Sequence, residues 1–547
     1  MKRSLRLFGD TLLLTAVSLA VRTSSLLFSS YVSRRAGAET VGLFSLVTSV
    51  SFFAVTFAVS GINLGVTRLV SEALGRGDAF AVRGCMRRAF LYLSFFGGIA
   101  ALTLFSFAEP IARRLLSDAR AAPSLRALAF SLPPIALSAA LNGYFCAVRR
   151  VWKSAAAQLF EEAVSILVSA FLFSLLLPRG IGYACLALVA GSAVSETAAA
   201  LLSLCFYLGD RSRRARGNGR DRGGWRALFA ITLPVSLSAY VRSALVTVEH
   251  ILIPVGLAAV ASGADRALAD YGVLSGMVLP TVLYPTAFSA AFSSLLVPEA
   301  ASLAARGDRA LCRETAKRAI GTILSFGIGA AGILISAAPG LETLLYPGTG
   351  AGPYIRTLAI VLPVMMLDTV TDGLLKGLGE QLWSMAVNIG DAFLSVLLVW
   401  LLLPRAGIEG YLFIVIFCEA LNCFFSLTRL LSVTGARLSP FPLVLPPFLC
   451  VFAATRLSLF FLSRLPLSGG EETVLHLLFS AFLTLAFLLF LRGKHPLQRE
   501  SACDKMKKKE KRRERGEKHG PDHRGKTESR PQHRGGDRQT GAAAGVS

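Results

Sequence analysis

Apolar residues recur along this chain in runs of about 20–25, separated by short polar links. A helix of that length crosses a hydrocarbon core of about 30 Å. A single segment in lipid must be helical to satisfy its own backbone hydrogen bonds. The pattern therefore predicts an all-α polytopic membrane protein with fourteen transmembrane helices. The expected spans are about 10–33, 41–66, 86–108, 125–148, 154–177, 181–207, 226–255, 271–297, 316–338, 354–378, 382–403, 408–432, 441–463 and 473–491.

The chain also repeats itself. Several short sequences return at a fixed offset of 230 residues, and further upstream the offset is 220 residues. Such an offset indicates duplicated structural units. We expect two pseudo-symmetric six-helix bundles at 1–225 and 226–435, followed by two unmatched spans at 436–492. The matched sequences are Arg76-Gly77-Asp78 with Arg306-Gly307-Asp308, Leu132-Pro133 with Leu362-Pro363, Asn142-Gly143 with Asp372-Gly373, and Val21-Arg22 with Val241-Arg242.

Lys and Arg concentrate in alternate links between the spans, at 68–88, 149–153, 211–226 and 306–318. The positive-inside rule then places both termini in the cytosol, with Arg34-Arg35 and Arg113-Arg114 as exceptions. Because each half has six spans, the two halves have the same orientation. This predicts a pseudo-two-fold axis along the membrane normal, with a substrate path between the halves. Asp78 and Asp308 are expected to cap the helices that follow them.

Two segments have the composition of flexible chain. The link 208–226 is rich in Gly and Arg, and the tail 493–547 combines many charges with almost no apolar residues. Such sequences do not bury enough apolar surface to fold. The basic block 505–515 would favour an anionic inner leaflet; the alternative is a tail that only aids solubility.

A polar stripe runs along the first span at helical spacing and includes Ser18, Arg22 and Ser25. Arg22 lies near mid-membrane, where an uncompensated charge costs roughly 2.5–3.5 kcal/mol, so it should face protein or water. The seventh span has a similar polar face, formed by Ser238, Arg242 and Glu249. We predict that both arginines border a central cavity and bind an anionic group, because the guanidinium fork suits phosphate. The alternative is that acidic neighbours neutralise them, such as Glu249 beside Arg242.

Carboxylates inside the apolar runs form a second candidate set. Asp368 and Asp372 lie one turn apart in the tenth span, and Glu161 and Asp391 enter the fifth and eleventh spans. Intramembrane carboxylates carry protons or Na⁺ in many transporters. Here they would couple transport to Na⁺, H⁺ or the membrane potential, or pair with arginines. Prolines near these sites, including Pro285 and Pro363, would permit helix bending.

Other function classes lack support. The nine cysteines are scattered without a CxxC pair, so neither a disulfide framework nor a metal site is expected. There is no P-loop, HExxH or GxSxG motif, which argues against an enzyme or an ATP-driven pump. The formal net charge of +23 arises largely from links and the tail rather than a basic folded domain, so no nucleic-acid partner is expected.

The segments Ser60–Gly65 with Arg68–Ala73, and Leu233–Ser243 with Glu249–Pro254, resemble the stage V sporulation protein B branch of the MOP flippase superfamily. The resemblance covers about residues 5–490. It implies a V-shaped alternating-access transporter of the bacterial cytoplasmic membrane that moves polyprenyl-pyrophosphate-linked saccharides such as lipid II. It also implies cavity arginines on the first span, where Arg22 fits. Thr23 follows Arg22, whereas the MurJ-type pattern has an acidic residue there.

The leading hypothesis is thus a flippase for a lipid-linked saccharide, without a resident cofactor. Membrane lipids and cell-wall synthesis proteins would be its partners, and it would act as a monomer. A cation-coupled MATE-type multidrug exporter is the first alternative, and it would need an acidic cavity. A polytopic glycan polymerase or ligase would need large outer loops, which are missing. A non-transporting scaffold for a cell-wall complex stays open.

Overall fold

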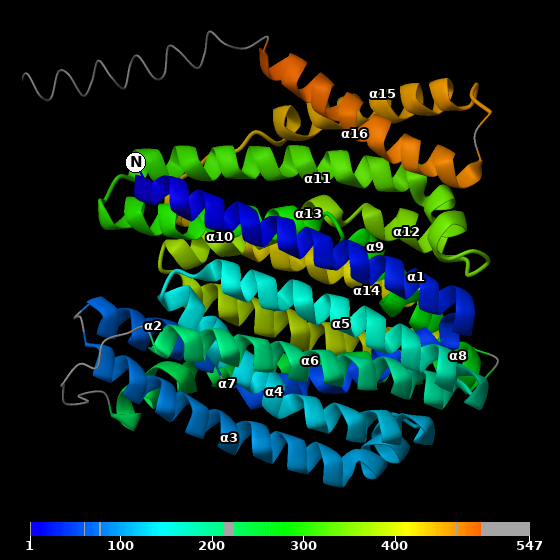
Figure 1. The fold of residues 1–547 in the computed structure, drawn as a ribbon. Coiled ribbons are helices and arrows are strands. Elements are labelled where there is room, and N and C mark those ends of the chain that lie inside the picture. Colours follow the sequence, from blue (N-terminus) through cyan, green and yellow to red (C-terminus); the bar gives the residue numbers. More distant parts are fainter. Residues whose placement is uncertain are drawn as a thin grey trace, which may run out of the picture. The chain divides into compact units, whose positions relative to one another are not determined.

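The computed structural model describes residues 2–59, 61–75, 78–212, 224–261, 263–466 and 468–493 (Figure 1). Residues 1–488 form one compact unit, and the described part of the second unit, which begins at Leu489, is the end of the last helix. The described residues are helical or lie in short links, with no strand among them. The elements are α1 (Lys2–Val59), α2 (Ile62–Gly75), α3 (Ala79–Pro110), η1 (Ile111–Leu115), η2 (Ala119–Ala121), α4 (Ala122–Ala147), α5 (Val151–Leu176), η3 (Leu177–Arg179), α6 (Ile181–Ser212), α7 (Trp225–Ala258), α8 (Ala264–Tyr271), η4 (Gly272–Val278), α9 (Leu279–Val282), α10 (Thr286–Ala305), α11 (Arg309–Leu345), α12 (Ala351–Ala359), α13 (Leu362–Gly377), α14 (Gln381–Thr434), α15 (Pro440–Leu462) and α16 (Gly469–Gly493).

The predicted fold class is confirmed, and the fourteen spans can be followed through the described residues. Helix α1 holds the first span and most of the second, joined across Gly37, and the second span ends in α2. Helix α14 holds the eleventh and twelfth spans, joined across Gly407. Both glycines have positive φ (77° and 56°), which glycine adopts without steric cost, so each link is a sharp turn. The eighth span is divided among η4, α9 and α10. The tenth is a pair, α12 and α13, bent by 48°.

The prolines have different effects on the helices. Helix α4 continues through Pro133-Pro134, and α7 continues through Pro234. The eighth span, in contrast, breaks at Leu283–Pro285, and Pro363 occupies the first turn of α13 just after a break. Proline is tolerated in a first helical turn because that N–H has no partner in the helix. Among the predicted prolines, Pro285 and Pro363 therefore lie at interruptions of the helices.

The repeat is visible in the packing. Gly143 of α4 packs against the backbone of Asn63 on α2, and its carbonyl accepts a bond from Thr67 (3.1 Å). The equivalent Gly373 of α13 packs against Ser293 on α10, and Ser293 donates to the Thr369 carbonyl (3.1 Å). Since Asn63 and Ser293 are also 230 residues apart, the same close helix approach is built in both halves.

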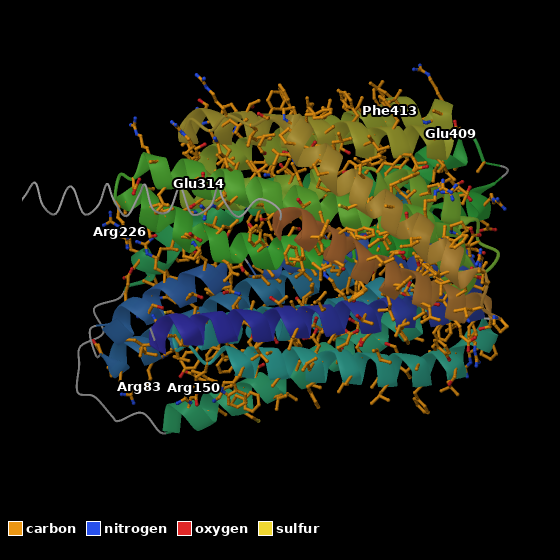
Figure 2. The ribbon with its side chains drawn as sticks, turned by 90° about the horizontal axis from the view of Figure 1, so that it is seen from above. Arg83, Arg150, Arg226, Glu314, Glu409 and Phe413 are labelled. Carbon is orange, nitrogen blue, oxygen red and sulfur yellow. The ribbon has the colours of Figure 1, made fainter. Side chains whose placement is uncertain are left out.

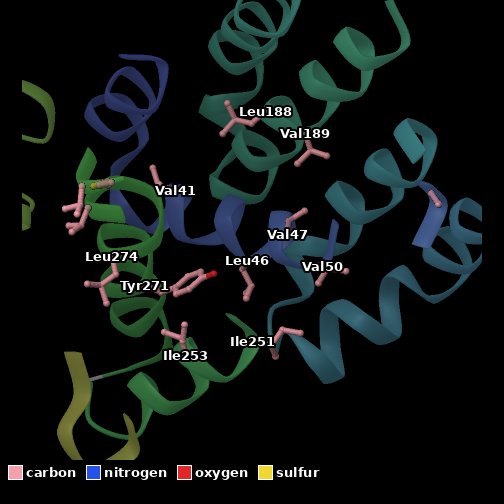
Figure 3. Close-up of a cluster of buried hydrophobic side chains, with 14 of the residues drawn as sticks. Val41, Leu46, Val47, Val50, Leu188, Val189, Ile251, Ile253, Tyr271 and Leu274 are labelled. Carbon is pink, nitrogen blue, oxygen red and sulfur yellow. The ribbon is translucent and has the colours of Figure 1, made fainter. Parts of the chain in front are cut away.

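Helix α1 lies between the two halves. It contacts α3, α4, α5 and α6 on one side, and α7, α8 and η4 on the other. Figure 3 shows buried side chains of its second span, including Leu46 and Val47, with Ile251 of α7 and Tyr271 of α8. A side chain at Gly42 would collide with the Leu268 backbone, and one at Gly272 with the Ala38 carbonyl. The glycines thus let the halves approach to backbone contact.

The basic links gather at one end of the bundle. Figure 2 shows Arg83, Arg150 and Arg226 at the same end as Glu314, while Glu409 lies at the opposite end. We call the first of these the basic end. The capping prediction is confirmed there, because Asp78 accepts bonds from the backbone N–H groups of Phe80 and Ala81. Asp308 likewise accepts from Leu311, at 3.0 Å.

Helices α15 and α16 lie beside α11, at the top of Figure 1. Buried His476 of α16 forms hydrogen bonds with Ser336 of α11 (2.9 Å) and Ser458 of α15 (3.0 Å), and so ties the two extra helices to the bundle. The predicted disordered tail lies outside the described residues from 494 onward, as do residues 213–223 of the flexible link.

Candidate functional site

A cavity of about 650 Å³ lies between the two halves, in the size range of small-molecule sites. Residues of the first two spans, all in α1, form one side of it, and the seventh and eighth spans form the other. No Asp or Glu occurs among its described lining residues. These are Val21, Arg22, Ser25, Leu26, Ser29, Val41, Phe44, Ser45, Thr48, Ser49, Phe52, Val246, His250, Ser275, Gly276, Pro280, Leu283 and Tyr284.

Arg22 lines this cavity and is held by the break in the eighth span. Its Nη1 donates to the Leu283 carbonyl (3.0 Å) and to the Thr286 hydroxyl (3.2 Å). The hydroxyls of Thr23 and Tyr284 also lie 2.9 Å apart. The Leu283 carbonyl also accepts from the backbone N–H (3.0 Å) and the hydroxyl (2.6 Å) of Thr286, so it is fixed in this turn, and the negative end of a helix favours a nearby cation. The broken helix thus fixes one edge of the guanidinium, while Nη2 has no protein partner among the described residues.

Hydroxyl groups surround Arg22 on the same helix. Ser25 lines the cavity and donates to Glu162 of α5 (2.8 Å), and Ser29 lines it and donates to the Gly276 carbonyl (2.9 Å). The predicted stripe therefore faces the cavity from Arg22 to Ser29. Ser18, the remaining member of the predicted set on α1, is half-buried and is not among the lining residues.

The seventh span contributes His250 rather than the predicted residues. His250 lines the cavity, and its Nδ1 lies 3.0 Å from the Tyr271 hydroxyl. Ser238 donates to the Val235 carbonyl of its own helix, and Glu249 accepts from Ser395 of α14 (2.7 Å). His250 lies within the Glu249–Pro254 segment, but its sequence pattern did not identify it as a cavity residue.

Arg242 is exposed but does not belong to the cavity lining. It lies within electrostatic reach of Asp391 and Glu419 on α14. The alternative pairing with Glu249 is not seen, since the described residues contain no ion pair between them. The structure thus separates the two arginines, and a role for Arg242 in binding substrate stays a prediction.

Four carboxylates come together in the C-terminal half, and we call them the C-half acidic cluster: Glu249, Asp368, Asp391 and Glu419. Glu419 is within electrostatic reach of the other three. Asp368 accepts a long bond from Asn422 (3.5 Å), and Oδ1 of both Asp368 and Asp391 is buried without a hydrogen-bond partner among the described residues. Unsatisfied buried carboxylate oxygens call for a proton, a cation or water.

The N-terminal half has a smaller counterpart. Glu161 of α5 lies within hydrogen-bonding reach of Glu196 of α6. Glu161 and Asp391 are equivalent under the 230-residue offset, and Glu196 and Glu419 occupy the sixth and twelfth spans. Both halves therefore place two carboxylates between their last two helices.

Asp372 lies apart from the cluster. It accepts bonds from Ser384 and Asn388 (3.2 Å to Asn388) and pairs with Lys376 (3.2 Å). The equivalent residue of the first half, Asn142, accepts from Ser154 (2.7 Å). The same link in both halves is thus fastened by the same contact, which gives Asp372 a structural role in the described geometry.

At the end opposite the basic end, contacts join the two halves. Ser30 donates to the Leu345 carbonyl at the end of α11 (2.6 Å), and Arg34 donates to the Leu344 and Leu345 carbonyls. Arg120 bonds Asp118 and Glu39 (2.8 Å each) and also reaches Asp265 of α8 (3.2 Å). We call these contacts the outer lock. They tie helices of the first half to helices of the second.

A family of proteins described as "Polysaccharide biosynthesis protein" matches residues 7–303, more than half of the chain. The chain belongs to this family. It is 24% identical over 407 residues to stage V sporulation protein B of Bacillus subtilis (strain 168), covering 73% of this chain and 79% of that protein. Sporulation protein YkvU of the same organism is 19% identical over 335 residues, covering 60% of this chain and 72% of that protein.

Solved structures show the same fold. The lipid II flippase MurJ in an inward closed conformation aligns with a TM-score of 0.61 and 13% identity, covering 88% of this chain and 99% of MurJ. An inward-facing multidrug resistance MATE family transporter of the MOP superfamily aligns with a TM-score of 0.60 and 15% identity, covering 77% of this chain and 99% of that one. The predicted resemblance is confirmed: the chain belongs to the polysaccharide biosynthesis family and shares its fold with these MOP superfamily structures.

Proposed function

We propose that this protein is a flippase that moves a polyprenyl-pyrophosphate-linked saccharide, lipid II or a related precursor, across the bacterial cytoplasmic membrane by alternating access. One observation carries the proposal: Arg22 projects into a 650 Å³ cavity between the two halves, held by a broken helix. A cation costly to bury in a membrane is kept where an anionic substrate would meet it.

Arg22 would bind the pyrophosphate through the guanidinium edge that the protein leaves free, since guanidinium and phosphate form charge-assisted bonds. The serine and threonine hydroxyls and His250 would contact the sugar. The polyprenyl chain would stay in the bilayer beside the opening between the halves. The outer lock would hold the cavity closed on the far side, and release of the lock would open it there.

The C-half acidic cluster and the Glu161–Glu196 pair would couple this cycle to Na⁺ or H⁺. A bound cation satisfies the orphaned oxygens of Asp368 and Asp391, and its loss leaves two like charges in a poorly solvated site. Arg242, beside Asp391 and Glu419, would compensate part of that charge. The protein would work as a monomer in the cytoplasmic membrane, with both termini cytosolic, beside the proteins that make the precursor.

A cation-coupled multidrug exporter is the second candidate, and the MATE-like fold favours it equally. The side chains that line the cavity do not favour an exporter. An organic cation needs carboxylates in the site, whereas the described lining offers Arg22 and His250 and no Asp or Glu. Because one fold hosts several functions, the site rather than the fold decides between the two candidates.

The test is reconstitution of the full chain into liposomes with a labelled polyprenyl-pyrophosphate disaccharide. Accessibility of the label in each leaflet is followed with time, and a fluorescent organic cation is tested in parallel. We expect protein-dependent movement of the lipid-linked sugar and none of the drug. Cation-driven drug export without lipid movement would establish the exporter instead.

A further inference from the structure

A second, smaller cavity opens at the start of α11. Its volume is about 270 Å³, several times the roughly 30 Å³ share of one water. Four residues line it: Arg313 and Lys317 on the first turns of α11, and Gly435 and Arg437 in the link after α14. Two segments more than a hundred residues apart therefore bring three cations to one cavity.

None of the three cations has an acidic partner in the part of the chain that the structure describes. The nearest acids on α11 are already engaged, since Glu314 pairs with Arg318 (2.7 Å) and Asp308 caps the helix. Gly435 has positive φ (63°), and an added Cβ would lie 3.0 Å from the Arg313 guanidinium. Glycine there keeps the space beside Arg313 open. Like charges that line one cavity without a counter-charge repel one another, and an anion between them would relieve that repulsion.

We propose that Arg313, Lys317 and Arg437 form a binding site for a phosphate-bearing anion, separate from the central cavity. Two guanidinium groups and an ammonium present many donors to a tetrahedral group with several acceptor oxygens. The phosphate could belong to an anionic phospholipid or to a soluble phosphate compound.

The surroundings favour the lipid. Glu314, the neighbour of Arg313, lies at the basic end of the bundle (Figure 2). Helix α15 begins three residues after Arg437, and its first turns expose Phe441 (72%) and Phe448 (52%). Large apolar side chains exposed on a spanning helix face acyl chains. A lipid could thus place its chains along α15 and its headgroup phosphate in the basic cavity, which fits the attraction of juxtamembrane basic residues to anionic leaflets.

The first half repeats two of the three cations. Arg83 and Arg87 are the equivalents of Arg313 and Lys317 at the 230-residue offset. The corresponding end of α6 carries buried Asp210, which is bound to Arg150 and Lys153. Arg83 and Arg87 therefore provide a comparison pair: the same kind of charge at the equivalent positions of the first half, outside the cavity lined by Arg313, Lys317 and Arg437.

The test is a thermal-stability titration of the purified full chain in detergent. Phosphatidylglycerol, phosphatidylcholine and inorganic phosphate are each added to the wild type, to R313Q/K317Q and to R83Q/R87Q. Phosphatidylglycerol should raise the melting temperature of the wild type and of R83Q/R87Q, because a ligand that binds only the folded state stabilises it. R313Q/K317Q should need at least about tenfold more of this lipid for the same shift, since each charged hydrogen bond contributes about that factor.

A second readout needs no variant. Phosphatidylglycerol should protect Lys317 of the wild type from amine acylation, while Lys376, which pairs with Asp372, reacts equally in every lipid. Protection by inorganic phosphate equal to that by phosphatidylglycerol would assign the site to a soluble phosphate compound. Equal Lys317 labelling in all additions, or the same titration for R313Q/K317Q and R83Q/R87Q, would overturn the proposal.

Discussion

Arg22 on the first span donates a 3.0 Å hydrogen bond to the backbone carbonyl of Leu283, where the eighth span breaks. The two residues are 261 positions apart and belong to different halves of the repeat. The Leu283 carbonyl also accepts from the backbone N–H of Thr286 (3.0 Å), so it is fixed in the turn between α9 and α10 and holds the guanidinium without an acidic side chain. The charge of Arg22 is therefore not cancelled and stays available to the cavity.

Replacing Arg22 should abolish transport without unfolding the protein. Arg22→Gln loses both the charge and the fork, so transport of the lipid-linked sugar should fall at least about tenfold. Arg22→Lys keeps the charge, but one ammonium group cannot bind the Leu283 carbonyl and a phosphate in the way that the planar guanidinium can. This variant should therefore retain part of the transport activity. Leaflet accessibility in liposomes measures this. Arg464→Gln, which removes an arginine stacked on Phe460 outside the cavity, is the control. Full activity of a normally inserted Arg22→Gln variant would refute the assignment.

Weakening the outer lock should expose the cavity on that side. Arg34→Gln removes the bonds to the end of α11, and Arg120→Gln removes the link to Asp265. Exposed contacts of this kind contribute about 1 kcal/mol, a shift of about fivefold in the population of open molecules. The measure is the labelling rate of Ser29→Cys, in a background without native cysteines, by a membrane-impermeant maleimide.

The matched control for the lock is Arg113→Gln. Arg113 is also an arginine at the outer end, but it pairs with Glu109 within its own half (2.8 Å). Its loss should leave labelling unchanged. If Arg34→Gln and Arg120→Gln also leave the labelling rate of Ser29→Cys unchanged, the outer lock does not control access to the cavity.

The equivalent ends of the two halves should differ in stability. Asp210 and Lys153 are buried and 2.6 Å apart, and Arg150 also binds Asp210. Glu380, the equivalent of Arg150 at the 230-residue offset, pairs with Arg429 in the second half, and that pair is partly exposed. Asp210→Asn leaves Lys153 buried without a counter-charge and should cost about 3–5 kcal/mol of unfolding free energy. Glu380→Gln should cost about 1 kcal/mol or less. Thermal unfolding in detergent compares them, and adding Lys153→Met to Asp210→Asn should recover much of the loss. Equal losses for the two single variants would contradict this account.

Sequence patterns predicted the spans, the repeat and the polar stripe because each depends on local periodicity. Arg22 lies in the cavity lining, where a charge from an apolar run can face protein or water, and its role in binding stays a prediction. The pattern could not show that Arg22 bonds Leu283, because a backbone carbonyl at a helix break has no residue signature of its own. Nor could periodicity tell whether the polar face of the seventh span turns toward the cavity or toward its own half. For that reason the sequence predicts Arg242 in the cavity beside Arg22 and does not identify His250 as a cavity residue.

The carboxylates should divide into two functional groups according to their partners. Asp391 and Asp368 have buried oxygens without a hydrogen-bond partner in the described part of the chain, so we expect a cation or a proton there. Asp372 is fully engaged by Ser384, Asn388 and Lys376. Asp391→Asn should therefore remove the dependence of transport on a Na⁺ or H⁺ gradient while the protein stays folded. Asp372→Asn should lower the melting temperature and leave the ion dependence of the remaining activity unchanged.

Arg242→Gln provides the companion measurement. If Arg242 compensates the charge of Asp391 and Glu419, its loss should alter the ion concentration needed for half-maximal transport severalfold and leave the affinity for the lipid-linked sugar unchanged. Transport by proteoliposomes under imposed Na⁺ or pH gradients separates the two quantities. A pure loss of sugar affinity would instead return Arg242 to the substrate site, and unchanged gradient dependence in Asp391→Asn would remove the C-half acidic cluster from the coupling mechanism.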